Sequence, residues 1–389
     1  MPTTPIDALS NKLERYRKFH VADPKNVTLI LDIVDIYIQL RLLDSAIDFI
    51  GQLSTELQSN VSVELKLAEA LVLVRRYPDA QILLEKLLHR EITGEDEDSA
   101  HYLLGLAKFY QAQIDESLDH FEKAICGGLK SGQIYQHLAY GNHSLNRLDK
   151  ALEFAQKWVD ISPNASSMGY LSLVFFDLEQ LDQAKQWAIQ AHNKDSLESN
   201  ATVVLGSIAM LESTLDKADK FFEVACEQNM SNGRAWLGKG LLATLRGQPE
   251  IAKAHLNQAH QLMPLHIGTL HAIGWIQFGE QDHFKAAQTF RQALDLDRNF
   301  SESHGALACS LIHLQDLGTS QEHIELAARL NPQNFAGNFA RVLLYRHQGE
   351  NAKAEQLYMT LVERFKATTG KNLNSLLGHY LLPTGDKPH

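Results

Sequence analysis

Histidine is the residue of this chain with the most evident capacity for chemistry, since the 389 residues include 18 of them. Four lie close together in sequence, at His255, His260, His266 and His271, and imidazole nitrogens are common zinc ligands. The intervals between them are five, six and five residues, whereas a zinc-binding helix places two histidines four residues apart on one face. The pattern therefore indicates scattered surface and packing histidines, and no metal site is expected.

The other reactive residues form no catalytic pattern. The chain shows no Gly-rich phosphate loop, no nucleophile elbow and no Cys/His zinc spacing. Its carboxylate runs have the composition of solvated faces, and the acidic run 94–98 (GEDED) is expected to be an exposed loop. The sequence therefore predicts a protein that is not an enzyme and that needs no cofactor.

The overall charge and the cysteines limit what the protein can bind and in which compartment it works. A formal net charge of −11 and a pI near 5.9 argue against a broad nucleic-acid surface and against attraction to anionic lipid. No run of about 18 uncharged apolar residues is present, and the N-terminus lacks the features of a signal peptide. Cys126, Cys226 and Cys309 are odd in number and far apart, as in reduced proteins. We expect a cytoplasmic protein that neither inserts into membranes nor binds nucleic acid.

The elements that position these residues follow from an internal repeat. Small residues recur at intervals of 34, with small adjustments near the N-terminus, at Ala46, Ala80, Ser117, Ala151, Ala184, Ala218, Ala252, Ala286, Ser320 and Ala354. Apolar residues follow four and seven positions after each of them, which places all three on one face of a helix. This helix is the second of each repeat unit.

A first helix precedes it, across a short turn. Its apolar stripe contains a large residue followed by a small one, as in Leu104-Gly105, Leu205-Gly206 and Ile273-Gly274. Small residues at such positions let two helices cross closely, because no side chain separates the backbones. Each unit is therefore expected to be a helix-turn-helix.

These features resemble the tetratricopeptide repeat family, whose pattern is clearest at 271–297 (HAIGWIQFGEQDHFKAAQTFRQALDLD) and 201–229. The resemblance covers almost the whole chain and implies an all-α, right-handed superhelical solenoid of about ten units. The division predicted is an N-terminal capping helix in 1–26, a repeat solenoid in 27–368, and a C-terminal capping helix and tail in 369–389. The units are expected to start near 27, 61, 98, 132, 165, 199, 233, 267, 301 and 335.

In this family the first helices line a concave groove, so the resemblance implies a binding face for another protein. The same positions here hold apolar, aromatic and a few polar residues, which predicts a groove for a peptide or amphipathic segment. The candidate residues are Tyr102, Phe109, Tyr110, Tyr140, His143, Phe176, Met210, His271, Trp275, Phe278, Phe339 and Arg346.

The role of such a groove stays open between several alternatives. Some family members clamp a partner's C-terminal carboxylate with Lys, Asn and Arg, but the matching positions here hold residues such as Leu65, Glu69 and Leu103. A scaffold or adaptor that holds a partner segment is the first hypothesis. The alternatives are a homo-oligomeric structural protein that associates with itself, and a regulatory or chaperone-like subunit of an enzyme or a secretion or assembly system.

Overall fold

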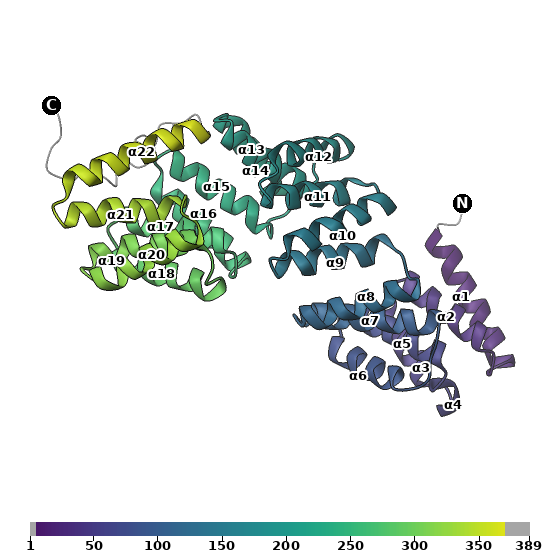
Figure 1. Cartoon of the computed structure of the whole chain (residues 1–389). Helices are drawn as coiled ribbons and strands as arrows, with labels where there is room; N and C mark the ends of the chain where they lie inside the picture. The colour runs from purple at the N-terminus through teal and green to yellow at the C-terminus, as the bar shows by residue number, and fades with distance from the viewer. Residues whose placement is uncertain (1–4, 370–389) are drawn as a thin grey trace. The chain divides into compact units, whose positions relative to one another are not determined.

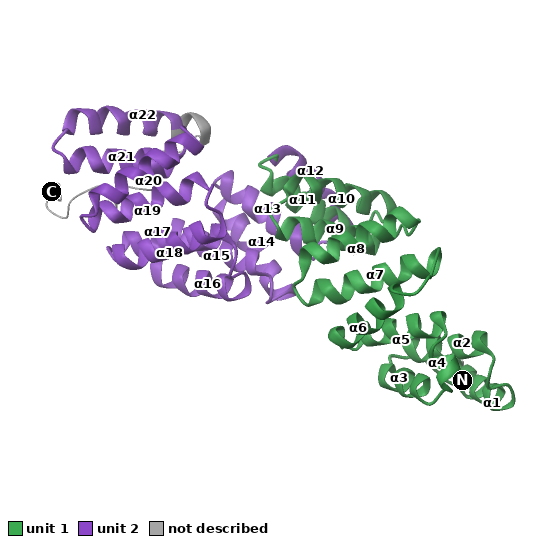
Figure 2. Ribbon diagram, turned by 60° about the horizontal axis from the view of Figure 1, so that its bottom comes forward, with its two compact units in different colours: residues 1–180 green, residues 181–389 purple. Residues whose placement is uncertain are grey.

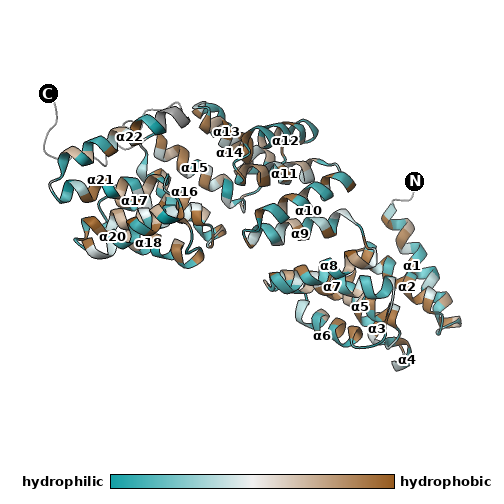
Figure 3. Ribbon diagram, viewed as in Figure 1, coloured by the Kyte–Doolittle hydropathy of each residue, from teal (hydrophilic) through white to brown (hydrophobic). Residues whose placement is uncertain are grey.

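The computed structural model describes residues 5–369, with side chains as far as residue 364, and every element in that range is an α-helix (Figure 1). The helices belong to two compact units, formed by residues 1–180 and 181–389 and here named unit 1 and unit 2 (Figure 2). Figure 3 colours the helices by hydropathy. Second helices such as α14 (Leu215–Gln228) combine apolar and polar residues, whereas first helices such as α17 (Ile267–Gly279) are mainly apolar, as expected for helices packed on more than one side.

Unit 1 consists of a first helix followed by helices joined in pairs by short turns. Its helices are α1 (Pro5–Ala22), α2 (Val27–Gln39), α3 (Leu43–Gly51), α4 (Thr55–Gln58), α5 (Val61–Leu73), α6 (Tyr77–Leu88), α7 (Glu95–Tyr110), α8 (Ile114–Gly127), α9 (Gly132–Ser144), α10 (Leu148–Ile161) and α11 (Ala165–Asp177).

Unit 2 begins with one helix and continues in the same paired pattern. Its helices are α12 (Leu181–Lys194), α13 (Ser199–Leu211), α14 (Leu215–Gln228), α15 (Gly233–Leu245), α16 (Pro249–Leu262), α17 (Ile267–Gly279), α18 (His283–Leu296), α19 (Ser301–His313), α20 (Leu317–Leu330), α21 (Phe335–His347) and α22 (Asn351–Thr369). The all-α repeat architecture expected from the sequence is thus confirmed within each unit.

Asparagine starts many of the first helices of these pairs, because its side chain caps the free backbone N–H groups there. The Asn26 side chain accepts a hydrogen bond from the Leu29 N–H (3.1 Å), and Asn164 accepts one from the Ser167 N–H (2.9 Å). The same cap recurs at equivalent positions, which are Asn26, Asn60, Asn164, Asn232 and Asn334.

Each turn after a first helix contains one residue in the left-handed backbone region. After α2, the Leu42 N–H donates to the Tyr37 carbonyl (2.9 Å) and the Arg41 N–H donates to the Ile38 carbonyl (3.0 Å), which is a Schellman motif. The left-handed residues are Arg41, Arg75, Ala112, Asn146, Glu179, Ser213, Gly247, Gln281, Gln315 and Gly349. Most of them are not glycine, so the hairpins impose a conformation that these residues disfavour.

This geometry predicts opposite effects for two matched substitutions. Ala112→Gly should stabilise unit 1 by about 1 kcal/mol, because glycine removes the steric cost of the left-handed region. Gly247→Ala should destabilise unit 2 by a similar amount, since no atom lies within 4 Å of the added Cβ and strain alone acts. Urea unfolding, read by hydrogen exchange in each unit, measures both changes in stability. Effects of the same sign would contradict the assignment of both residues to the left-handed backbone region.

In three pairs, α7–α8, α13–α14 and α17–α18, the core forms where a first-helix glycine meets a second-helix phenylalanine. A Cβ at Gly105 would lie 2.6 Å from Phe121 Cε1, and a Cβ at Gly274 would lie 2.5 Å from Phe290 Cε1. Both rings are fully buried. The small residues singled out in the sequence therefore leave room for these rings.

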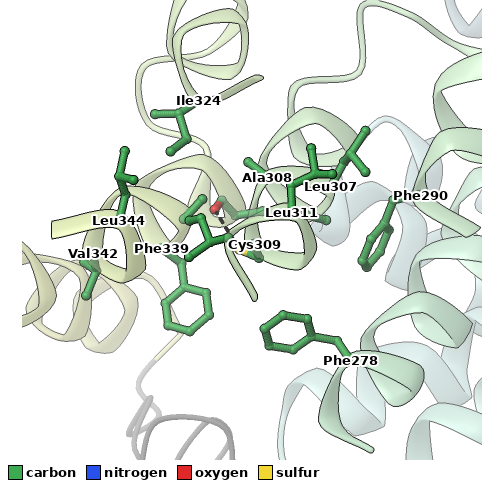
Figure 4. Close-up of a cluster of buried hydrophobic side chains, with 14 of the residues drawn as sticks. Phe278, Phe290, Leu307, Ala308, Cys309, Leu311, Ile324, Phe339, Val342 and Leu344 are labelled. Atoms are coloured by element: carbon green, nitrogen blue, oxygen red, sulfur yellow. Dashed lines mark hydrogen bonds between the residues drawn. The ribbon is translucent and has the colours of Figure 1, made fainter. Parts of the chain in front are cut away.

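In unit 2, the backbones of α19 and α21 come very close together. A Cβ at Gly305 would lie 2.1 Å from the Gly337 backbone nitrogen, so only glycine fits there. Nearby, the buried Cys309 thiol lies 3.7 Å from the Ala336 carbonyl oxygen (Figure 4), and burial raises the pKa of this thiol. The contact joins two successive first helices within one apolar core.

Two expectations about local structure have different outcomes. The acidic run 94–98 is not a loop, because residues 95–98 form the first turn of α7. Carboxylates in a first turn interact favourably with the positive end of the helix dipole, which explains why the helix starts there. The C-terminal capping helix placed in 369–389 lies outside the described residues, apart from the end of α22, and the division into 1–26, 27–368 and 369–389 stays a prediction.

Candidate protein-binding surface

Tyr110 is the most exposed of the candidate groove residues, with 54% of its surface accessible. It ends α7, and its ring stacks on Tyr77, the first residue of α6, at 5.2 Å between ring centroids and 17° between planes. On the other side, Phe109 packs edge to face against His137 of α9 at 5.3 Å. Four rings from three successive helical pairs therefore hold each other in fixed positions.

Tyr102 continues this arrangement on α7. Its hydroxyl donates to Gln133 Oε1 (3.3 Å), and its ring lies 6.0 Å from the buried Phe121 ring. Burial raises the pKa of Tyr102 to about 12, with smaller contributions from Tyr110 and Glu69, so it stays a hydrogen-bond donor at neutral pH. We name the set of Tyr77, Tyr102, Phe109, Tyr110 and His137 the aromatic strip of unit 1.

A polar group lies beside the strip on the first helices of the preceding pairs. Lys66 Nζ lies 2.6 Å from Asp35 Oδ1 and 2.9 Å from Glu69 Oε2, and all three side chains are partly exposed. The ion pairs and the Glu69 hydrogen bond raise the pKa of Lys66 against the opposing effect of burial, its largest single influence. The strip is thus flanked by paired charges, as in the polar rim of a protein interface.

A second group in unit 1 joins α9 to α11. His143 Nδ1 lies 2.7 Å from the Tyr170 hydroxyl, and His143 Nε2 lies 2.7 Å from Asp177 Oδ2. Tyr140 packs against Tyr170 at 4.4 Å between centroids. The His143 and Asp177 side chains are only 13% and 17% exposed, so this network fixes the register of the two helices. Phe176, also on α11, is half-buried.

In unit 2, the candidate residues divide into core and surface. Phe278 is 3% exposed and Phe339 is fully buried, so neither can offer its ring to a partner, and their assignment to the groove is corrected. Phe278 is covered by the rings of His283 and His313. Phe339 points into the core beside Cys309 (Figure 4), because the α19–α21 contact draws its helix inward.

The remaining candidates of unit 2 are partly accessible. Trp275 packs edge to face against Phe290 at 5.5 Å, and His271 Nε2 lies 2.7 Å from Ser303 Oγ. Burial lowers the pKa of His271 to about 4. Arg346 lies over the Tyr358 ring at 5.9 Å, and Met210 packs against a core that contains Phe222. His271 and Trp275 both lie on α17 and contact the same buried ring, Phe290, whereas Met210 and Arg346 lie on other helices.

The strip contains two residues that sequence reasoning missed. Tyr77 begins a second helix and His137 occupies a first helix, and neither stands at a position assigned to the groove. Tyr77 could have been noticed because it follows the turn directly and so faces the end of the next first helix. The pairing of Tyr110 with Tyr77 itself depends on how adjacent pairs stack.

Two other kinds of site are absent from the part of the chain that the structure describes. In residues 5–364, no group of three or more His, Cys, Asp or Glu side chains is arranged to hold a metal ion. No helix within the described range is long and apolar enough to cross a membrane. The aromatic strip is the candidate site that the geometry favours.

Helical pairs of about 34 residues, closed by the same left-handed turn, have the architecture of tetratricopeptide-type repeats. No family model matches the chain.

Among curated proteins, the chain is similar to the BBSome complex member BBS4 of Bos taurus, with 24% identity over 269 residues, 67% of this chain and 50% of that protein. It is also similar to the BBSome complex member BBS4 homolog of Drosophila melanogaster, with 21% identity over 354 residues, 83% of this chain and 72% of that protein. The chain spans about half the length of the Bos taurus relative.

The chain matches the APC/C hetero-tetramer Cut9–Hcn1 with a TM-score of 0.49 and 14% identity, covering 98% of this chain and 97% of that one. It matches a tetratricopeptide repeat protein from Parabacteroides merdae with a TM-score of 0.49 and 15% identity, over 67% of this chain and 98% of that one.

Proposed function

We propose that this protein is an interaction scaffold that holds an extended or helical segment of another protein against the aromatic strip of unit 1. The exposed Tyr110 ring, held in place by Tyr77, carries this proposal. Tyrosine rings are frequent anchors of protein interfaces, and rings that are already fixed lose little entropy on binding.

The scaffold role fits a subunit of a larger assembly. The named relatives are members of the BBSome complex, and their similarity to this chain supports a place in a multiprotein complex for it as well. Because the similarity covers about half of the Bos taurus protein, the identity of the complex is left to experiment.

The proposal also covers the cellular compartment and the absence of catalytic activity. We expect the protein to work in the cytoplasm, which the free thiols of Cys126, Cys226 and Cys309 support. We also expect no catalytic activity, because the polar side chains of the aromatic strip and of His143 are hydrogen-bonded to other side chains of the protein.

A photo-crosslinking residue at position 110 tests the proposal directly. We expect it to form a cross-link to a distinct partner, while the same residue at position 284, an exposed aromatic of α18 that is 60% accessible, should not. Mass spectrometry of the cross-linked product identifies the partner. Cross-links between two copies of this chain would favour the homo-oligomer instead.

The energetic contribution of the strip is tested with purified components. Tyr77→Ala combined with Tyr110→Ala should weaken the affinity for the cross-linked partner by about tenfold or more, since both anchors are removed. Phe284→Ala is the matched control and should leave the affinity unchanged. Equal affinity of the double variant and the unchanged protein, with helicity retained, would exclude the strip as the binding site.

A further inference from the structure

A groove with a volume of about 570 Å³ lies between α1 and α3 of unit 1, and none of its lining residues belongs to the aromatic strip. Its lining is largely apolar. Leu13 and Val21 come from α1, Leu40 follows α2, and Phe49 and Leu53 come from α3 and the segment after it. Leu13 is nearly buried, whereas Val21 is 82% exposed, so the groove is open to solvent. A volume of this size falls within the range of ligand-binding pockets.

The groove is open because α3 is short. It has 9 residues, whereas the second helices α6 and α8 of the next two pairs have 12 and 14. A Cβ added at Gly51, the last residue of α3, would have no atom within 4 Å. On α1 the lining residues run from Ser10 to Val21, which at 1.5 Å per residue is about 16 Å, or about three helical turns.

The charges beside the groove are mainly positive. Residues 5–22 include four Lys or Arg and two Asp or Glu, although the whole chain has a net charge of −11. Arg17 and Lys18 line the groove, and Glu14 is the one carboxylate among the lining residues described. Lys18 is paired with Glu14 at 2.7 Å, whereas Arg17 makes no ion pair within the described part of the chain. Arg41 lies in the turn between two lining leucines and is exposed.

We propose that this groove binds an acidic amphipathic helix of a partner protein, as a contact separate from the aromatic strip. A helix with apolar residues at positions i, i+4 and i+7 can place them in an apolar groove of about three turns. Carboxylates beside that apolar face would meet Arg17 and Arg41 in charge-assisted hydrogen bonds. The net negative charge of the chain opposes this binding little, since repulsion from distant charges is screened beyond about 8 Å at physiological salt.

The same features disfavour two other occupants. A second copy of α1 would bring Arg17 and Lys18 against the same cations, and like charges in contact are unfavourable. A lipid surface would contact outward apolar side chains of α1. Ile6 and Phe19 are of this kind, because they are 67% and 53% exposed and do not line the groove.

Binding of model peptides to the full chain tests the charge of the occupant. Three fluorescein-labelled helical peptides share one face of leucines and carry Glu, Gln or Lys at all other positions. In fluorescence anisotropy at physiological salt, the Glu peptide should bind at least tenfold more tightly than the Lys peptide, with the Gln peptide between them. Equal affinities, or tighter binding of the Lys peptide, would overturn the proposal.

Charge reversal at one position of α1 tests where the peptide binds. Arg17→Glu should reduce the preference for the Glu peptide over the Lys peptide by about tenfold, because it replaces a groove cation by a carboxylate. Arg15→Glu is the matched control, since Arg15 lies on the same helix and is exposed but does not line the groove. Equal effects of the two substitutions would indicate a general response to charge and contradict binding in the groove.

The apolar contact is tested with exposed residues, whose replacement leaves the core of unit 1 intact. Val21→Gln combined with Leu42→Gln changes two lining residues and should weaken the Glu peptide by about tenfold, whereas Ile6→Gln combined with Phe19→Gln should not. Tyr77→Ala combined with Tyr110→Ala should also leave this affinity unchanged, and a loss there would place the peptide on the aromatic strip. Binding of phosphatidylserine vesicles that Ile6→Gln/Phe19→Gln abolishes, without binding of the Glu peptide, would show a lipid contact and overturn the proposal.

Discussion

Gly305→Ala is expected to destabilise unit 2 by about 3 kcal/mol, the upper part of the range for overpacked cores. The added methyl would meet the backbone of α21, at 2.1 Å from the Gly337 nitrogen, and a backbone cannot move aside as a flexible side chain can. Relief therefore requires α19 and α21 to separate. That separation would open the core around Cys309 and Phe339.

The matched control for this substitution is Gly318→Ala in α20. A Cβ there has no atom within 4 Å, so the change should be neutral or slightly stabilising through helix propensity. Urea unfolding with hydrogen exchange of α19–α22 as the readout separates the two variants. Similar midpoints for both would mean that the helices are not in backbone contact.

The second large effect is a loss of stability of unit 2 in acid. Burial lowers the pKa of His271 to about 4 in the folded chain, whereas an unfolded histidine has a pKa near 6.5. The unfolded state therefore binds a proton below pH 6.5, whereas the folded state does not bind it until about pH 4. The stability is complete above pH 6.5 and falls by about 3 kcal/mol for this residue as the pH approaches 4.

Other histidines of unit 2 add to this effect. Burial and a neighbouring histidine lower the pKa of His283 and of His323 to about 4 as well, although their rings are partly in solvent and each should contribute less. The acid response of unit 2 should therefore be broad, with its midpoint between pH 4 and 6.5.

His271→Gln measures the contribution of one residue. Glutamine can keep a hydrogen bond to Ser303 but does not titrate, so the stability of unit 2 should depend less on pH than in the unchanged protein. Urea unfolding is carried out at pH 7, 5.5 and 4.5. The unfolded fraction of unit 2 is then read by a brief deuterium pulse at one common pH. His89→Gln, in unit 1, is the control, and the same pH dependence in both variants would refute the role of His271.

The sequence predicted the helical pairs well because their determinants are local. The 34-residue recurrence of small residues specifies which face of each second helix packs. The Asn caps of many first helices are a second local signal, which becomes evident only in the structure. The start of α7 was misplaced because an acidic run has the same composition in a loop and in a first turn. Only the helix dipole, which needs the helix to exist, distinguishes the two.

The candidate surface was harder to predict because it depends on how successive pairs stack. Phe339 has the sequence position of a groove residue, yet the glycine at 305 lets α21 approach so closely that the ring is buried. The contact of Tyr77 with Tyr110 likewise joins residues 33 positions apart. A search for helical spacings of three or four cannot find it.

The turns after the first helices are suitable positions for spectroscopic labels. Their backbone is held by main-chain hydrogen bonds, and eight of the ten already bear side chains other than glycine, several of them long and charged. Cysteines at Arg41 and Arg75, or at Gln281 and Gln315, should therefore carry spectroscopic labels without disturbing the helices. Distances between such labels would measure the curvature of each unit in solution, with and without its partner.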